Sequence, residues 1–319
     1  MNWNARCPDQ EFIELFEKHG AAETARRLKI EVRKVYSRRV SVEKRIGRQL
    51  TAPTQGANYR PTRFNIKHPD WLRLSITNGV ALVGSDAHYW PGDATTAHRA
   101  FVHFCKKLNP AIVVMNGDVL DGASISRHAP IGWESRPSLI QEIEACKDRL
   151  GEIELATNKA RKIWTLGNHD GRFETRLATV APEYARVNGV HLRDHFPNWE
   201  PAWSCIVNEA VVIKHRYKGG DHAAHNNTIR SGKSMVTGHL HSLKVTPYTD
   251  FNGTRYGVDT GTLSDPYGPQ FEDYTEQNPV NWRSGFAVLT FRDGRLMWPE
   301  VVHVLDEGKV EFRGEIIEV

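Results

Sequence analysis

The stretch Val80-Ala81-Leu82-Val83-Gly84-Ser85-Asp86-Ala87-His88 places a carboxylate and an imidazole directly after a short apolar run. An apolar run of this length that ends in polar residues is typical of a buried β-strand. Asp86 and His88 are two residues apart, so both side chains can turn toward one point. We therefore expect a strand whose carboxyl end carries part of a functional site.

Polar residues that carry metal-binding or catalytic side chains follow an apolar run at four further places along the chain. The four stretches are Asn116-Gly117-Asp118-Val119-Leu120-Asp121, Leu166-Gly167-Asn168-His169-Asp170, Ile213-Lys214-His215 and Thr237-Gly238-His239-Leu240-His241. Each follows an apolar run, and a glycine precedes most of the polar groups. Because loops at strand ends present side chains over the edge of an open sheet, we expect the five stretches to meet in one site.

Apolar periodicity around these stretches predicts an α/β architecture. We expect strands at 72–76 and 80–83, joined as a hairpin at Asn78-Gly79, a dipeptide that tolerates the positive φ values of tight turns. A helix at 94–108, a strand at 111–115, a long helix at 139–158 and a strand at 162–166 follow. After residue 200 the pattern changes to short strands at 205–207, 211–214, 235–237, 244–248 and 256–259, which predict a second sheet.

The mixed oxygen and nitrogen donors of the five stretches suit divalent ions such as manganese, iron, zinc or nickel. No cysteine joins them, which disfavours a structural zinc site. The chain's cysteines (Cys7, Cys105, Cys146 and Cys205) lie far apart, so we interpret them as small core residues rather than a redox pair or disulfide framework. Two ions roughly 3.5 to 4 Å apart can polarise phosphoryl oxygens and stabilise the charge of an in-line displacement, which explains the large number of donors.

In this order, D-x-H, G-D-x-x-D, G-N-H-D, a strand-end His and G-H-x-H resemble the motifs of calcineurin-like metallophosphoesterases. The resemblance covers about residues 80–265. It implies two packed mixed sheets flanked by helices, and hydrolysis of phosphate esters with two divalent ions, for which manganese is our first expectation.

Carried over by motif, the resemblance implies that Asp86, His88, Asp118 and His241 hold one metal and that Asp118, Asn168, His215 and His239 hold the other. It also implies that His169 protonates the leaving oxygen and that Asp170 orients His169. The fourth motif departs from the family pattern, because His215 is followed by Arg216-Tyr217-Lys218-Gly219-Gly220 instead of a single glycine. His222 and His225 are therefore alternative ligands, and we prefer His215 because it directly ends an apolar strand.

Three cationic side chains near the motifs are candidate contacts for a substrate phosphate. Arg127 and His128 follow the second motif in a long loop, and Arg172 lies on the helix after the third motif. An ordinary solvated loop, or a salt bridge in the case of Arg172, explains them equally well. The role of Asp121 stays open at this point.

The positive charge of the chain lies at its N-terminus. The net charge is +4, and residues 1–50 hold twelve Lys and Arg against seven Asp and Glu. Helices predicted at 8–19, 21–28 and 32–45 resemble a helix-turn-helix unit, whose last helix enters the DNA major groove. We therefore expect Arg33, Lys34, Arg38 and Arg39 to contact DNA. The alternative is a helical domain whose basic face binds a protein partner or forms a homo-oligomer.

These observations predict three parts: a basic helix-turn-helix-like domain at 1–48, a linker rich in Pro and Gly at 49–63 and a catalytic domain at 64–319. This pairing resembles proteins of the bacteriophage and bacterial type. No apolar run approaches the roughly 20 residues of a membrane span, and no secretory signal is visible, so we expect a cytoplasmic protein.

We expect a phosphodiesterase or nuclease that acts on DNA. The first alternative is a phosphomonoesterase for small molecules or proteins, and the second is a DNA-binding regulator without activity.

Overall fold

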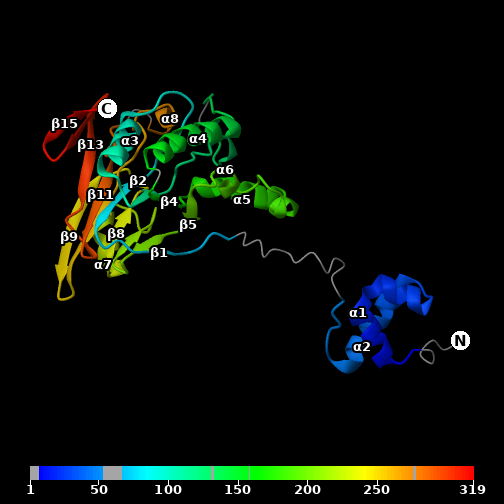
Figure 1. The fold of residues 1–319 in the computed structure, drawn as a ribbon. Helices are drawn as coiled ribbons and strands as arrows, with labels where there is room; N and C mark the ends of the chain where they lie inside the picture. The colour runs from blue at the N-terminus through cyan, green and yellow to red at the C-terminus, as the bar shows by residue number, and fades with distance from the viewer. Residues whose placement is uncertain (1–6, 53–66, 131–132, 158, 276–277) are drawn as a thin grey trace. The chain divides into compact units, whose positions relative to one another are not determined.

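The computed structural model describes residues 7–52, 67–130, 133–157, 159–275 and 278–319. The chain divides into two compact units, Met1–Phe64 and Asn65–Val319 (Figure 1). Each unit has its own apolar core.

The smaller unit consists of helix α1 (Asp9–Leu28) and helix α2 (Val32–Ile46). Gly20 interrupts α1 with φ 73° and ψ 176°, a conformation that glycine adopts without the strain a side chain would cause. Three helical segments therefore surround a small core, and they match the helices predicted at 8–19, 21–28 and 32–45. The core includes the buried side chains of Phe12, Phe16, Val35, Val42 and Leu50.

The larger unit contains two mixed β-sheets (Figure 1). The smaller sheet has the strand order β1 (Leu72–Leu74), β6 (Cys205–Val207), β7 (Val211–Ile213), β8 (Ser234–Thr237), β10 (Gly253–Asp259) and β9 (Lys244–Asp250). The larger sheet has the order β15 (Glu315–Glu318), β14 (Lys309–Phe312), β13 (Glu300–Asp306), β11 (Gly285–Arg292), β2 (Gly79–Gly84), β3 (Ile112–Met115), β4 (Arg161–Thr165) and β5 (Glu200–Ala202), and β12 (Arg295–Leu296) pairs with β11.

Strand β2 shows how the sheets and helices are layered. Its side chains alternate between two cores: Ala81 and Val83 belong to the cluster shared by the two sheets, whereas Leu82 belongs to the cluster on the other face of the larger sheet. This period-2 alternation explains why the strand reads as a continuous apolar run. The two sheets therefore pack face to face, with helices outside.

The helices of this unit are α3 (Thr96–Leu108), η2 (Ala123–Ile125), α4 (Leu139–Ala156), α5 (Asp170–Val180), η3 (Pro182–Arg186), α6 (Leu192–His195), α7 (Ala223–Ser231) and α8 (Glu272–Thr275). Helix α3 begins after Thr95, whose hydroxyl accepts a hydrogen bond from His98 N at 3.1 Å. It packs with α4 over the larger sheet, and α7 contacts β8, β9 and β10 of the smaller sheet. The predicted fold class, two mixed sheets flanked by helices with N-terminal helices, is confirmed.

The hairpin predicted at Asn78-Gly79 is wrong. Strand β1 pairs in parallel with β6 of the smaller sheet, whereas β2 lies in the larger sheet between β11 and β3. The connection crosses from one sheet to the other, and Asn208 fixes it: Ile76 N donates to Asn208 Oδ1 at 2.9 Å, and Asn208 Nδ2 donates to Ile76 O at 2.7 Å. Pairing with distant strands outweighs the local turn preference.

The four cysteines are free and buried, as predicted. Among the helices that the structure describes, none combines the length and apolar character required to span a bilayer.

Candidate metal centre

The five predicted stretches lie at the carboxyl ends of strands from both sheets. Strands β2, β3 and β4 run parallel in the larger sheet, and β7, β8 and β10 run parallel in the smaller one. Parallel strands bring their carboxyl ends to the same edge of a sheet, so the loops that follow them can meet. The larger sheet supplies the first three stretches and the smaller sheet supplies the last two.

Glycines in these stretches allow the loops to approach one another. A Cβ atom added at Gly117 would lie 2.6 Å from His215 Cβ, and one at Gly167 would lie 2.8 Å from Asp118 Cγ. At Gly238 it would lie 2.7 Å from Ser85 Cβ and would also strike the Asp86 carboxylate. Each glycine thus leaves room for a residue from a different stretch, which explains why glycines precede the polar residues.

Five polar residues of the cluster have left-handed backbone conformations. Their φ values are 52° for Asp86, 40° for His88, 49° for Asp118, 73° for His239 and 55° for His241. Residues other than glycine adopt this region at a cost, and such strain accumulates at functional sites, where the surrounding structure enforces it. The fold therefore holds these side chains in conformations that an unconstrained chain would avoid.

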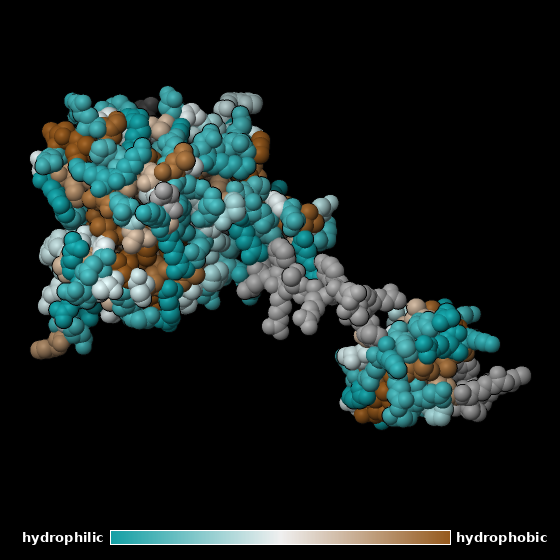
Figure 2. Space-filling view, viewed as in Figure 1, coloured by the Kyte–Doolittle hydropathy of each residue, from teal (hydrophilic) through white to brown (hydrophobic). Residues whose placement is uncertain are grey.

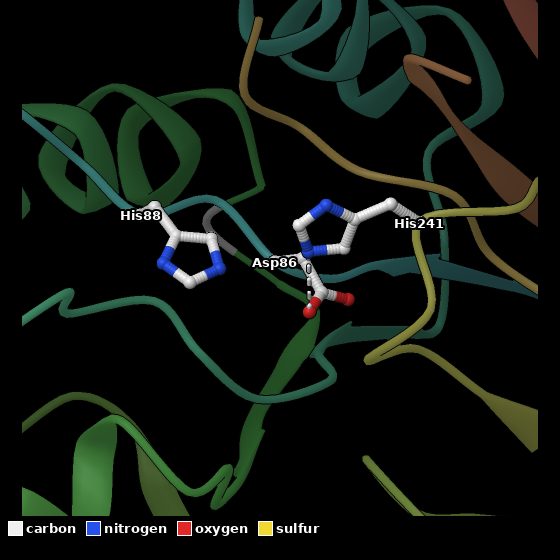
Figure 3. A group of neighbouring side chains, drawn as sticks. All are labelled: Asp86, His88 and His241. Carbon is white, nitrogen blue, oxygen red and sulfur yellow. Dashed lines mark hydrogen bonds and ion pairs between the residues drawn. The ribbon is translucent and has the colours of Figure 1, made fainter. Parts of the chain in front are cut away.

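Asp86, His88 and His241 form the first group of candidate ligands, with their donor atoms within 4.8 Å of one another. All three are buried. Figure 3 shows the Asp86 carboxylate directed toward the His241 ring, and Asp86 Oδ1 lies 3.2 Å from His241 Nε2. The other carboxylate oxygen, Oδ2, accepts a hydrogen bond from His239 N at 2.8 Å.

Asp118, His215 and His239 form the second group. His215 Nε2 lies 3.0 Å from Asp118 Oδ2, and His215 Nδ1 is 2.8 Å from Asn116 O. Asn168 lies between Gly167, which packs on Asp118, and His169, whose backbone N donates to Asp118 Oδ1 at 2.8 Å.

The two alternative histidines lie elsewhere. His222 is exposed at the start of α7, and the His225 ring packs against Tyr248. The structure thus brings His215, and neither alternative, to the cluster.

Carboxylates and imidazoles in this cluster shift one another's protonation. Burial raises the pKa of Asp86, but the charges of His241 and His215 outweigh it and lower the pKa to about 2. Burial lowers the pKa of His215, but Asp118 and Asp86 outweigh it and raise the pKa to about 10. The buried carboxylates therefore favour positive charge between them, as expected of a cation site.

The residues fit two divalent ions. The donors in the two groups are carboxylate oxygens and imidazole nitrogens, without a thiolate. In the described part of the chain, Asn168 Oδ1 and His241 Nδ1 are buried atoms without a hydrogen-bond partner. Buried polar atoms are normally paired, so these orphaned acceptors indicate a missing partner. The cluster is a site for a dinuclear metal centre.

His169 lies beside this cluster, where its position depends on Asp121. His169 Nδ1 is 2.9 Å from Asp121 O and 3.1 Å from Asp121 Oδ1, and the same Oδ1 lies 2.8 Å from His88 Nδ1. Burial lowers the pKa of His169, but the hydrogen bond to Asp121 and the charge of Asp118 outweigh it and raise the pKa above its ordinary value. Asp121 thus orients both a candidate ligand and the candidate acid.

The expectation that Asp170 orients His169 is wrong. The buried Asp170 carboxylate accepts hydrogen bonds from the backbone N atoms of Gly167, Asp118, Val119 and Leu120 and from Trp164 Nε1. It therefore fixes the loop that carries Asp118. The sequence analysis left the role of Asp121 undecided. Its position as the last residue of the G-D-x-x-D motif was the signal that could have indicated a role in the site.

The three candidate phosphate contacts differ in their surroundings. Arg172 lies next to His169: its Nη2 is 3.1 Å from His169 Nε2, and its Nη1 donates to Asp121 O at 2.9 Å. Arg127 and His128 are exposed on the loop after η2, and within the described residues no contact joins their side chains to the cluster. Arg172 is the one that the structure brings to the site.

The four basic residues predicted to contact DNA also differ. Arg33 and Lys34 are exposed on α2. Arg38 is buried, donates to Cys7 O and lies 4.8 Å from the centre of the Phe12 ring, so it supports the helical core and is wrong as a DNA contact. Arg39 Nε lies 2.7 Å from Glu43 Oε1, so its guanidinium is already engaged in an ion pair and is less suited to contact DNA.

Comparisons with known proteins identify the family of this chain. A family model described as calcineurin-like phosphoesterase matches residues 81–256. Two relatives named Gene 54 protein are 27% identical over 248 residues, from Mycobacterium phage L5, and 26% identical over 253 residues, from Mycobacterium phage D29. Each of these alignments covers 72% of this chain and 95% of the relative.

Solved structures were also matched. Vps29 complexed with zinc, from Entamoeba histolytica, is 14% identical, with 75% of this chain and 98% of that chain covered and a TM-score of 0.40. A dimetal phosphatase from Danio rerio is 11% identical, with 76% and 98% covered and a TM-score of 0.39. The resemblance inferred from the five motifs is confirmed by the family match, which spans more than half of the residues. The chain therefore belongs to the calcineurin-like phosphoesterase family.

Proposed function

We propose that this phosphoesterase is a phosphodiesterase that cleaves DNA. In this proposal Asp86, His88, Asp118 and His241 hold one ion, and Asp118, Asn168, His215 and His239 hold the other, with Asp118 as the shared ligand. Two of the three groups of neighbouring donors, Asp86 with His88 and His241 and Asp118 with His215 and His239, support this assignment. Manganese is our first candidate for the ions, and iron, zinc and nickel are alternatives.

When bound, the two ions polarise the phosphoryl oxygens and activate the attacking water. In this proposal water adds to phosphorus and releases one proton to solvent, the bond from phosphorus to the ester oxygen breaks, and His169 donates a proton to the departing oxygen. The contacts of His169 Nδ1 with Asp121 O and Oδ1 support this role, because they hold the ring beside the candidate ligands. In this proposal Arg172, whose Nη2 lies 3.1 Å from His169 Nε2, binds a nonbridging oxygen of the same phosphate.

The exposed face of α2 is the single observation that favours DNA. With 3.6 residues per turn, Arg33, Tyr36, Ser37, Val40 and Lys44 share one face, and all five are exposed. This face carries no carboxylate, and within the described residues Arg33 and Lys44 have no ion-pair partner. A helix face that combines free cations, hydroxyls and an apolar side chain matches the phosphates and base edges of a DNA groove. The proposed DNA contacts are therefore Arg33, Tyr36, Ser37, Val40 and Lys44, with Lys34 at the edge of this face. Arg38 and Arg39 are no longer among them.

The test compares metal-dependent hydrolysis of bis-p-nitrophenyl phosphate and p-nitrophenyl phosphate, and of labelled single-stranded and double-stranded DNA. We expect cleavage of the diester and of DNA, both abolished by a chelator. Activity confined to the monoester would overturn the proposal and make the chain a phosphomonoesterase.

A protein-binding role for the helices is the second candidate, and a specific feature favours it. Val32, Tyr36 and Val40 follow one another at intervals of four residues on α2, with 41%, 51% and 63% of their surfaces exposed. Figure 2 shows hydrophobic side chains among the mostly hydrophilic surface of the smaller unit. DNA binding through phosphates weakens steeply with salt, whereas binding through an apolar stripe does not, so a salt titration separates the two roles.

A further inference from the structure

A cavity of about 490 Å³ adjoins the second group of candidate ligands. Its wall includes His239, a member of that group, together with Leu166 and Gly167 after β4 and Lys214 and residues 216–219 after β7. The volume lies within the range of small-molecule sites, roughly 300 to 1,000 Å³. A substrate held at the metal centre can therefore extend into this cavity.

The cavity is strongly cationic. Lys214, Arg216 and Lys218 line it, and no carboxylate does. Within the described residues none of these three side chains has an ion-pair partner, whereas Arg161, for example, is paired with Glu200. Three unpaired cations around one cavity favour an anionic ligand, and phosphate in particular.

The loop that carries the cations is fixed at both ends. Lys214 N donates to Val236 O of β8 at 3.0 Å. The buried Asn227 of α7 accepts from Lys218 N at 3.1 Å and donates to Lys218 O at 3.2 Å. The cations therefore come from an ordered loop, and this is the loop where Arg216 follows His215 in place of the glycine expected there.

Two aromatic side chains complete the cavity. Trp203 and Tyr217 line it, and 41% and 47% of their surfaces are exposed. Cations that follow a phosphate backbone, combined with exposed aromatic faces, are the features with which proteins bind nucleotides of a single strand, because every base can stack on a ring.

We propose that this cavity binds the nucleotide adjacent to the scissile phosphate, with Lys214, Arg216 and Lys218 contacting its phosphate and Trp203 and Tyr217 stacking on its base. This inference deepens the proposed function and rests on it. It names the substrate as a polynucleotide strand rather than an isolated phosphate ester.

The test measures binding of thymidine 3′,5′-bisphosphate and of the two thymidine monophosphates to the full metal-loaded chain by isothermal titration. Thymidine 3′,5′-bisphosphate can place one phosphate at the metal centre and the other in the cavity, whereas either thymidine monophosphate fills only one position. We expect the bisphosphate to bind about tenfold more tightly or better, since a hydrogen bond to a charged group contributes on the order of a tenfold gain. The double variant Arg216→Ala/Lys218→Ala should remove most of this preference, and Arg216→Lys should retain it.

The matched control is Arg295→Ala, an exposed cation on β12, which should leave the preference unchanged. The stacking is tested with a base-free deoxyribose bisphosphate: Tyr217→Ala should abolish the advantage of the base, and Tyr217→Phe should keep it. Thermal melting confirms that each variant is folded.

An equal affinity for the bisphosphate and the monophosphates in the wild-type chain would overturn the subsite, as would a preference that survives in the double variant. These outcomes are distinct from failure of the proposed function, which hydrolysis reports separately. A chain that prefers the bisphosphate yet hydrolyses only monoesters would retain the subsite and lose the nuclease assignment.

Discussion

Replacing Gly167 with alanine should disrupt the metal centre through a single added methyl group. The new Cβ would lie 2.8 Å from Asp118 Cγ and would also strike Asp118 Oδ1 and N. Favourable carbon–carbon contacts begin near ~3.5 Å, so the Asp118 carboxylate must move by at least about 0.7 Å. The backbone cannot yield easily, because Asp170 accepts hydrogen bonds from both Gly167 N and Asp118 N.

A shift of this size displaces the proposed shared ligand of both ions. We expect the affinity for manganese to fall at least tenfold and the hydrolysis of bis-p-nitrophenyl phosphate to fall roughly 100-fold, the scale of a 1 Å misplacement in an active site. Overpacking should also destabilise the fold by about 1–3 kcal/mol.

Isothermal titration with manganese, steady-state kinetics and urea unfolding measure the three effects. Gly151→Ala is the control, because Gly151 lies in α4 and an added Cβ there would meet no atom within 4 Å. It should be neutral or stabilise the fold by up to ~1 kcal/mol through helix propensity. If Gly167→Ala binds manganese and turns over as well as the control, the interlocked arrangement of the loops is refuted.

Three further predictions concern the acid, a buried histidine and the basic helix. His169→Ala should leave the metal content unchanged, as measured by elemental analysis, and slow turnover roughly 100-fold or more; undiminished turnover in a metal-replete sample would exclude the acid role. Burial lowers the pKa of His98 to about 4, although the hydrogen bond to Glu152 acts to raise it. As the pH falls, His98 therefore takes up its proton in the unfolded chain, where its pKa is near 6.5, before it does so in the folded chain. The contribution of neutral His98 to the free energy of unfolding is therefore fully present above pH 6.5 and should decrease by roughly 3 kcal/mol as the pH falls to 4. Urea unfolding measures this loss, and in a His98→Gln variant the free energy of unfolding should fall less steeply with pH. Equal pH dependence in the two proteins would contradict the assignment. Arg33→Ala/Lys44→Ala should weaken DNA binding at low salt and reduce the slope of its salt dependence by about two, with hydrolysis of the small diester as the internal reference; an unchanged slope would move the helix to the protein-binding role.

The strand-end residues could be predicted from the sequence because the signal is local. An apolar run followed by a polar residue specifies both the strand and the position of the side chain at its end, as for Val83 and Asp86. Parallel neighbours then bring such ends together without any further information. The ligand cluster and the two-sheet architecture follow from these local patterns.

The partners of the polar side chains could not be predicted in the same way. Asp170 follows His169 in the sequence, yet its carboxylate caps the backbone around Asp118, and Asp121 takes the contact with the His169 ring. Sequence neighbours at the start of a helix point in different directions, so adjacency is poor evidence of a hydrogen bond. The prediction that Arg38 contacts DNA was wrong for a similar reason. Its place on the buried face of α2 depends on the packing of Phe12 and Val35.

The candidate site lies at the seam between the sheets, by which we mean the edge where the loops after strands of both sheets meet. This position explains why so many of its residues have left-handed backbone conformations. Asp86, Asp118 and Asn168 follow strands of the larger sheet, whereas His215 and His241 follow strands of the smaller one. Neither sheet alone therefore holds the complete set of proposed ligands, and the distance between the two parts of the set depends on the apolar layer between the sheets.

Contacts across the seam fix that distance directly. Gly238 packs on Ser85, His239 N donates to Asp86 Oδ2, and His215 contacts Asp118. These contacts hold the left-handed conformations of the proposed ligands in place without any bound ion. The packing of the two sheets therefore compensates the backbone strain, which is of order 1–3 kcal/mol per residue. A preorganised site of this kind loses little affinity to reorganisation when it takes up metal. The cationic loop that contains His215 is held to strand β8 by the hydrogen bond from Lys214 N to Val236 O. The distance between the proposed nucleotide subsite and a phosphate at the proposed metal centre is therefore constrained by the same sheet.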